Sequence, residues 1–226
     1  MKKTIISLGG SFIVPDKIDI NYLIKLKEIL MQFSSTHQFY IIAGGGKIAR
    51  DYISAAKLLV PDIDNITLDM VGIRAGLLNS QLLFSIFKEK SYPSLITDEK
   101  KIVTSYPFII NGLYQPGGSS DNIAVKIAIS QEVNEIINLT NIDYVYNKDP
   151  KKYKDASPLK EIAWSDFKKI VGSKWVAGMN APFDPIASIL AAKNKINVIL
   201  ANGNDLDNLK NILMDKKYFK GTLIHS

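Results

Sequence analysis

Two glycine clusters near the amino terminus, each between a short apolar run and an amphipathic segment, constrain the fold most strongly. The first is Gly9-Gly10-Ser11 after Ile5-Ile6-Ser7-Leu8, and the second is Gly44-Gly45-Gly46 after Tyr40-Ile41-Ile42-Ala43. Glycine lets the backbone approach a ligand closely, and the amides that open a helix attract anions. Two such strand–glycine–helix units predict one crevice with two phosphate-binding loops, which a phosphoryl transfer between two molecules requires.

The order of apolar and amphipathic segments predicts an α/β fold, a three-layer α/β/α sandwich with a mostly parallel central sheet. The expected strands are 4–8, 39–43, 93–97, 107–111, 135–139, 197–201 and 221–224. The expected helices are 21–33, 47–59, 66–89, 121–132, 184–194 and 205–214. Turn signals replace this regularity between 141 and 185, so we expect two lobes, 1–139 and 140–226, packed as one globular unit.

The composition argues against several chemistries. The chain has no cysteine, and its two histidines are His37 and His225, so we expect no disulfide, thiolate nucleophile, histidine triad or metal site held by the protein. No apolar run approaches the roughly eighteen residues of a membrane span, and the basic start leads into a strand and not a signal peptide. We therefore expect a cytoplasmic protein with no membrane partner.

The net charge of +6 comes from lysines scattered as doublets, such as Lys2-Lys3 and Lys168-Lys169, among acidic residues. No nucleic-acid-binding motif accompanies these lysines, so we expect no nucleic-acid partner. A positive surface of this kind helps to attract anionic substrates.

Neither glycine cluster has a common nucleotide-binding pattern. A P-loop requires glycine at the position of Ile41, and G-x-G-x-x-G is missing. In the second cluster, however, Lys47 and Arg50 follow the glycines within one helical turn. Cations placed there suit a phosphate oxygen.

Two later segments also have the composition of ligand loops. Gln115-Pro116-Gly117-Gly118-Ser119-Ser120-Asp121 leads from a strand through glycines to a helix start, where its hydroxyls and acid either cap the helix or bind a second phosphate. Thr140-Asn141, with Tyr146 and Asp149 close behind, ends another strand. This segment either holds a base and ribose or forms an asparagine-rich turn.

Together, in this order and spacing, the four segments resemble the amino-acid-kinase superfamily, and within it the archaeal-type UMP (uridylate) kinase family, over nearly the whole chain. The resemblance implies an amino-acid-kinase fold without a P-loop that transfers the γ-phosphate of ATP to UMP with Mg²⁺, in pyrimidine nucleotide biosynthesis. It also implies that nucleotides are the partners and that the protein is a homo-oligomer, a hexamer in this family.

Carried over by position, the resemblance assigns three sets of residues. The ATP-binding set is Gly10, Ser11, Gly46, Arg50, Thr140, Asn141, Tyr146 and Asp149. The UMP-binding set is Gly45, Asp69, Gln115, Pro116, Gly117, Gly118, Ser119, Ser120 and Asp121. The catalytic set is Asp184, Arg50 and Lys47. Such a set is chemically sufficient because phosphoryl transfer depends mostly on positioning and charge neutralisation.

Three positions depart from the family pattern. Ser7 and Ile189 stand where lysines are expected, and Leu77 stands where an arginine is expected in the third helix. A cation beside the transferring phosphate contributes several kcal/mol of transition-state stabilisation, on the order of 3 kcal/mol. The cations available to replace it are Lys193, Lys47, Arg50 and Arg74.

Two alternative functions stay open from the sequence. One is a superfamily kinase for another small acceptor, such as an amino acid, carbamate or isopentenyl phosphate, which the altered Leu77 favours. The other is a catalytically weak nucleotide-binding regulatory protein, which Ile189 favours. Asp69 and the Ser119-Ser120-Asp121 loop favour a nucleotide acceptor.

Overall fold

The computed structural model describes residues 1–174, 181–216 and 218–226, and within them a seven-stranded sheet has the order β3-β2-β1-β4-β8-β9-β7. The strands are β1 (Lys2–Leu8), β2 (His37–Ala43), β3 (Phe108–Asn111), β4 (Glu135–Thr140), β7 (Glu161–Ala163), β8 (Asn197–Asn202) and β9 (Thr222–His225). Neighbouring strands are parallel except β8 and β9. Two short strands, β5 (Val145–Tyr146) and β6 (Pro158–Leu159), form a separate antiparallel pair. The predicted mostly parallel α/β sheet is confirmed.

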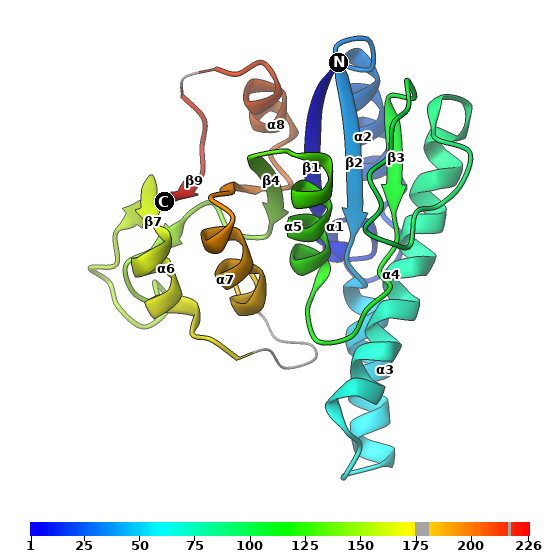
Figure 1. The fold of residues 1–226 in the computed structure, drawn as a ribbon. Helices are drawn as coiled ribbons and strands as arrows, with labels where there is room; N and C mark the ends of the chain where they lie inside the picture. Colours follow the sequence, from blue (N-terminus) through cyan, green and yellow to red (C-terminus); the bar gives the residue numbers. More distant parts are fainter. Residues whose placement is uncertain (175–180, 217) are drawn as a thin grey trace.

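Helices cover both faces of this sheet (Figure 1). The helices α5 (Ser120–Gln131), α6 (Trp164–Val171) and α7 (Pro185–Lys193) share one core with it, and α2 (Ile20–Gln32) and α8 (Leu206–Leu213) share the other. The remaining helices are α1 (Gly10–Ile13), α3 (Gly46–Leu59) and α4 (Asn65–Phe87), and α4 continues into the 3-10 turn η1 (Lys88–Lys90). Figure 1 shows α3 and the start of α4 side by side, beyond the carboxyl ends of β1 and β2.

The central parts of β1, β2, β4 and β8 are mostly apolar because they are buried on both sides. Successive residues of a strand point to opposite faces. Ile5 therefore enters the core beneath α5, while Ile6 and Leu8 enter the core beneath α2 and α8. The same alternation turns Ser7 toward α5, and this becomes important for the site.

Two expectations about the chain between these elements are wrong. The predicted strand 93–97 is reduced to isolated bridges, Ser91 with Phe108 and Ile96 with Asn111, because Pro93 has no N–H for a strand ladder. Helix α6 and strand β7 lie in the region 141–185, where turns were expected. The signal for α6 is present in the sequence, since Trp164, Phe167 and Val171 recur at helical spacing and are all buried.

Helix α4 contradicts the expectation that no apolar run approaches the length of a membrane span. Together with η1 it spans Asn65–Lys90, with a mean hydropathy of 1.3 in its most apolar window, which is sufficient by length and composition to cross a membrane. The helix packs against α3, β2 and β3, and 39% of that window is buried in the structure. A helix packed within a folded core has the same composition.

Phe108→Ala tests the aromatic packing on the α2 face. Phe108 is fully buried and stacks on Phe39 and Phe87, with ring centroids 5.6 and 4.3 Å away. Removing its ring should lower the free energy of unfolding in urea by about 3–5 kcal/mol, because the rigid sheet cannot close the cavity. The control is Val103→Ala at a 90% exposed position, which should change it by less than about 0.5 kcal/mol. A loss below about 1 kcal/mol for Phe108→Ala would contradict this packing.

Candidate active site

A cavity of about 480 Å³ opens beyond the carboxyl ends of β1, β2 and β4, where parallel α/β sheets bind their ligands. Most of the residues predicted from the sequence line it. They are Gly10, Ser11, Gly45, Gly46, Arg50, Asp69, Gly118, Ser119, Ser120, Asp121, Thr140 and Asn141. The four sequence segments therefore meet at one place, although they are up to about 130 residues apart in the chain.

The two glycine loops of this cavity touch each other through their backbones. A Cβ atom at Gly10 would lie 2.2 Å from the backbone nitrogen of Gly46 and 2.3 Å from the carbonyl oxygen of Gly44. Gly46 has a φ of +66°, which favours glycine, and a Cβ there would lie 2.4 Å from the Gly10 carbonyl oxygen. The loops need glycine for their contact with each other, before any ligand is considered.

A buried side chain holds the second glycine loop in place. The Nδ2 of Asn79, which is 2% exposed on α4, donates a 2.8 Å hydrogen bond to the carbonyl oxygen of Gly44. The Gly44 N–H donates to the carbonyl oxygen of Leu8 at 3.0 Å. Both groups of Gly44 are thus fixed, so the orientation of the peptides that open α3 is set by β1 and α4.

Asp121 is the polar centre of the cavity. Its Oδ1 accepts hydrogen bonds from Ser7 Oγ at 2.8 Å and Asn138 Nδ2 at 3.1 Å, two residues that lie opposite each other on β1 and β4. Burial raises the pKa of Asp121 to about 7; the Ser7 hydrogen bond opposes this rise and the nearby Asp184 carboxylate adds to it. Ser7, which stands where the resemblance implies a lysine, thus donates a hydrogen bond to a buried acid with a raised pKa.

Asp184, expected to be catalytic, lies behind the wall of the cavity and is 2% exposed. As the N-cap of α7 it accepts hydrogen bonds through Oδ1 from the N–H groups of Ile186 and Ala187, at 2.6 and 3.1 Å. Its Oδ2 accepts a 2.7 Å hydrogen bond from the N–H of Ser119. The carboxylate is therefore directed at backbone amides.

Of the four cations that the sequence offered, the structure brings Arg50 to the cavity. Lys47 pairs with Asp51 at 2.7 Å and does not line the cavity. Arg74 and Lys193 are exposed on α4 and at the end of α7. Among the described residues, Arg50 is the lysine or arginine that lines the cavity, and no hydrogen bond or ion pair occupies its guanidinium.

Leu77 and Ile189, which stand where the resemblance implies an arginine and a lysine, have different surroundings. Leu77 packs in an apolar cluster, and its Cδ2 would be 2.5 Å from a Cβ at Gly112. Ile189 is 43% exposed on α7 and does not line the cavity. Neither position presents a charge to the site.

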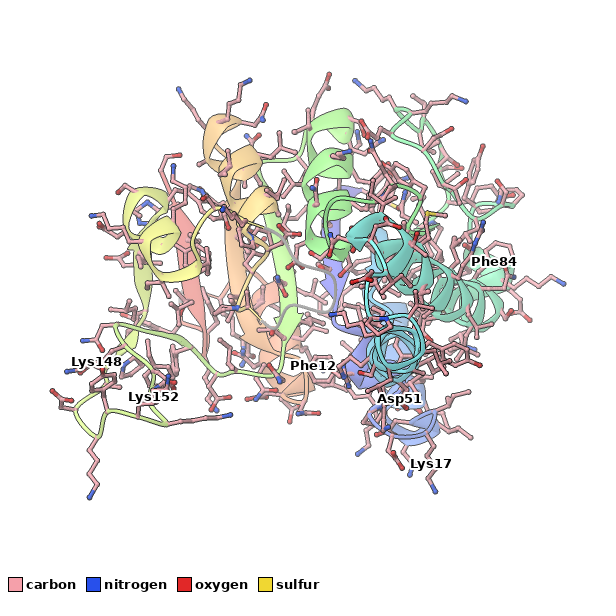
Figure 2. All side chains as sticks on the ribbon, turned by 90° about the horizontal axis from the view of Figure 1, so that it is seen from below. Phe12, Lys17, Asp51, Phe84, Lys148 and Lys152 are labelled. Carbon is pink, nitrogen blue, oxygen red and sulfur yellow. The ribbon has the colours of Figure 1, made fainter. Side chains whose placement is uncertain are left out.

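Several predicted site residues do not line the cavity. Gln115 is exposed and accepts a hydrogen bond from Lys126, and the N–H of Gly117, which follows Pro116, donates to Asp69 Oδ2 at 2.8 Å. Tyr146 is on β5, and Asp149 follows it on the loop that carries Lys148 and Lys152. Figure 2, viewed toward the carboxyl ends of the strands, shows that loop far from Asp51 on α3.

The cavity is also lined by residues that were not predicted to bind a ligand. Examples are Ile53, Ile73, Leu113, Asn138 and Pro182. Asn138 could have been identified as a site residue from the sequence, because an amide interrupts the apolar run of a buried strand, Ile136-Ile137-Asn138-Leu139. The apolar residues could not, since their sequence pattern is that of ordinary core positions.

The described residues contain no group of three or more histidine, aspartate or glutamate side chains placed to hold a metal ion. Asp69 and Asp121 nevertheless supply two carboxylates to the cavity wall. Magnesium is usually held by one or two carboxylates, waters and substrate phosphates. The residues present therefore fit a magnesium ion that enters with a nucleotide.

Gly10→Ala tests the contact between the glycine loops. The new methyl group would overlap backbone atoms of Gly44 and Gly46, which cannot turn aside as a flexible side chain would. We expect thermal unfolding at least about 4 °C lower, as a loss of at least about 2 kcal/mol predicts for a chain of this size. Gly72→Ala in α4 is the control: its Cβ would meet its nearest neighbour at 3.8 Å, so stability should stay level or rise. Equal effects of the two substitutions would show that the loop contact is not tight.

Asp121→Asn tests the raised pKa. An acid whose pKa is higher in the folded state than its ordinary 3.8 stabilises the fold at low pH, and this contribution is lost as the pH rises to about 7. The free energy of unfolding, measured in urea at pH 5 and pH 8, should therefore fall less with pH in Asp121→Asn than in the wild type. The exposed Asp207→Asn should keep the wild-type dependence. The same fall in Asp121→Asn as in the wild type would refute the raised pKa.

The chain is similar to known proteins along nearly its whole length. The amino acid kinase family profile matches residues 2–202. Uridylate kinase of Thermoplasma volcanium is 37% identical over 215 residues, covering 94% of this chain and 93% of the relative. The crystal structure of uridylate kinase from Archaeoglobus fulgidus superposes with a TM-score of 0.78 at 27% identity, covering 99% of this chain and 100% of that one. UMP kinase from Bacillus anthracis shares the fold at 19% identity, with a TM-score of 0.76, covering 99% and 96% of the two chains. With its two touching glycine loops and the matches along its length, the chain belongs to the amino acid kinase family.

Proposed function

We propose that the protein is a UMP kinase, which transfers the γ-phosphate of ATP to UMP with Mg²⁺. The observation that carries the proposal is the meeting of three helix starts, those of α1, α3 and α5, around one cavity large enough for the reacting parts of two nucleotides. Helix starts present unpaired N–H groups to anions. The relatives of matching length named above are uridylate kinases, which favours UMP as the acceptor.

In this proposal the two substrates take different sides of the cavity. Gly45, Asp69 and the loop before α5 bind UMP, and Gly10, Ser11, Gly46, Thr140 and Asn141 bind ATP. Residues 1–139 then form the acceptor lobe and residues 140–226 the ATP lobe. The boundary falls at the end of β4, which pairs with β1 on one side and β8 on the other, so one sheet spans both lobes.

The chemistry assigned to the chain is positioning and charge neutralisation. The phosphate of a nucleoside monophosphate has a second pKa of about 6, so it is largely a dianion at neutral pH and needs no general base. Arg50 and the N–H groups of the helix starts hold the phosphates in line, and bound Mg²⁺ supplies further positive charge. Asp69 and Asp121 accept hydrogen bonds from the N–H groups of Gly117 and Asp184, and their carboxylates would also accept hydrogen bonds from waters of a bound magnesium ion.

The wall between α3 and α4 favours a nucleotide over a smaller acceptor. Ile53, Ile73 and Leu113 form an apolar surface beside Asp69. A nucleoside has both an apolar ring face and sugar hydroxyls to match this combination, whereas carbamate or an amino acid has neither. We infer that a nucleotide is also preferred over isopentenyl phosphate, which has no sugar hydroxyl to donate a hydrogen bond to the Asp69 carboxylate.

We also propose a homo-oligomer in the cytoplasm, a hexamer by resemblance, acting in pyrimidine biosynthesis. Support for the oligomer comes from the projecting end of α3. Tyr52, Leu58 and Leu59 are 67%, 84% and 82% exposed there, and Val60 follows at 51%. Exposed apolar side chains gathered in this way are typical of interaction surfaces.

Arg50→Ala tests the cation of the site, in a coupled assay of ADP formation with MgATP and UMP, CMP or AMP. Loss of the guanidinium should reduce kcat/KM for UMP by about 100–1000-fold, because no other described cation lines the cavity. Arg74→Ala, at an exposed position, is the matched control and should stay within about 3-fold. Wild-type turnover with a different acceptor, and none with UMP, would replace the proposed substrate.

A further inference from the structure

The start of α5 is closed by a ring of three hydrogen bonds that joins it to the start of α7. The N–H of Ser119 donates to Asp184 Oδ2 at 2.7 Å, and the N–H of Asp184 donates to Asp121 Oδ2 at 3.1 Å. The N–H of Asp121 donates to Ser119 Oγ at 3.1 Å and completes the ring. Each member thus donates through its backbone and accepts through its side chain.

The ring determines which amide at the start of α5 is left for a ligand. Of the three consecutive N–H groups of Ser119, Ser120 and Asp121, the ring uses the first and the third. The N–H of Ser120 has no hydrogen-bond partner among residues 1–174, 181–216 and 218–226. The Ser120 hydroxyl faces the second glycine loop, since its Oγ would lie 3.4 Å from a Cβ at Gly44. Ser120 therefore presents two donors to the cavity.

Asp184 is the member of the ring that does not line the cavity. Its Oδ1 caps α7 through Ile186 and Ala187, and its Oδ2 is used by Ser119. No acceptor group of Asp184 is directed at a substrate, so its effect on the reaction must pass through Ser119 and Asp121.

We propose that Asp184 is a positioning residue, which uses this ring to hold the start of α5 so that Ser120 donates its N–H and hydroxyl to the phosphate of the acceptor. The proposal rests on the proposed function for the identity of that acceptor. It assigns Asp184 to acceptor binding, and not to the orientation of a lysine, which the chain lacks at Ser7 and Ile189.

Asp184→Ser separates this role from the capping of α7. Serine is a good N-cap, but it is too short to reach Ser119 as well, so the substitution opens the ring and keeps the cap. Asp205→Ser is the matched control, because Asp205 caps α8 by accepting from the Asn208 N–H at 2.9 Å and belongs to no such ring. Both variants are assayed with saturating MgATP and varied UMP.

We expect KM for UMP to rise about 10–100-fold in Asp184→Ser, as the loss of a charge-assisted hydrogen bond predicts, with kcat changed less than about 5-fold. Asp205→Ser should leave both constants within about 2-fold. Ser120→Ala should also raise KM, and adding it to Asp184→Ser should raise KM by less than the product of the two single effects, because both act on the same contact. Loss of kcat with KM unchanged, or fully multiplicative effects, would overturn the proposal.

Hydrogen exchange of the Ser119 amide tests the ring without any substrate. Opening the ring in Asp184→Ser should speed this exchange at least about 10-fold, while the amides of the α5 interior keep their protection. Unchanged exchange at Ser119 would overturn the proposal even if activity fell. If the wild type did not act on UMP, the proposed function would fail, and this exchange would still decide whether the ring exists.

Discussion

The contact between the backbones of Gly10 and Gly44–Gly46 is the constraint on which the rest of the site depends. Two parallel neighbours, β1 and β2, end at the same level, and the chain leaves both strands toward the same side. With no side chains between them, the loops close to backbone contact and the starts of α1 and α3 face one cavity. Any larger residue at Gly10 would separate these helix starts and change the distance between the phosphates they are proposed to bind.

Among the described residues, few positively charged side chains line the cavity. Arg50 is opposed by Asp69 and Asp121 in the cavity wall, so side chains alone leave little positive charge for phosphates. Backbone N–H groups at helix starts supply fixed positive ends, and they do not titrate or change conformation when a substrate arrives. Asp121, with its pKa raised to about 7 by burial, carries less negative charge than an ordinary aspartate at neutral pH, which also favours bound phosphates.

Residues behind the cavity wall are as important to this arrangement as those that line it. Asn79 fixes the Gly44 carbonyl, and Asp184 fixes the Ser119 amide. Both are buried polar side chains that hydrogen-bond to backbone groups. The position of the helix that carries each side chain therefore sets the orientation of a peptide in the cavity wall. A substitution at either position would alter the site without touching a ligand.

The sequence by itself determined the α/β class, nearly all the long helices and central strands, and the segments that form the cavity, because strand periodicity and glycine clusters are local signals. It missed α6 and β7, and it placed a strand at 93–97, where tertiary pairing and Pro93 decide the outcome. Only the tertiary structure decided which charged residues reach the cavity. Lys47 and Arg50 are three residues apart and lie on nearly the same face of α3, so their spacing does not distinguish them. Arg50 is exposed and lines the cavity, whereas Lys47 does not line it, because an ion pair with Asp51 holds the Lys47 ammonium group.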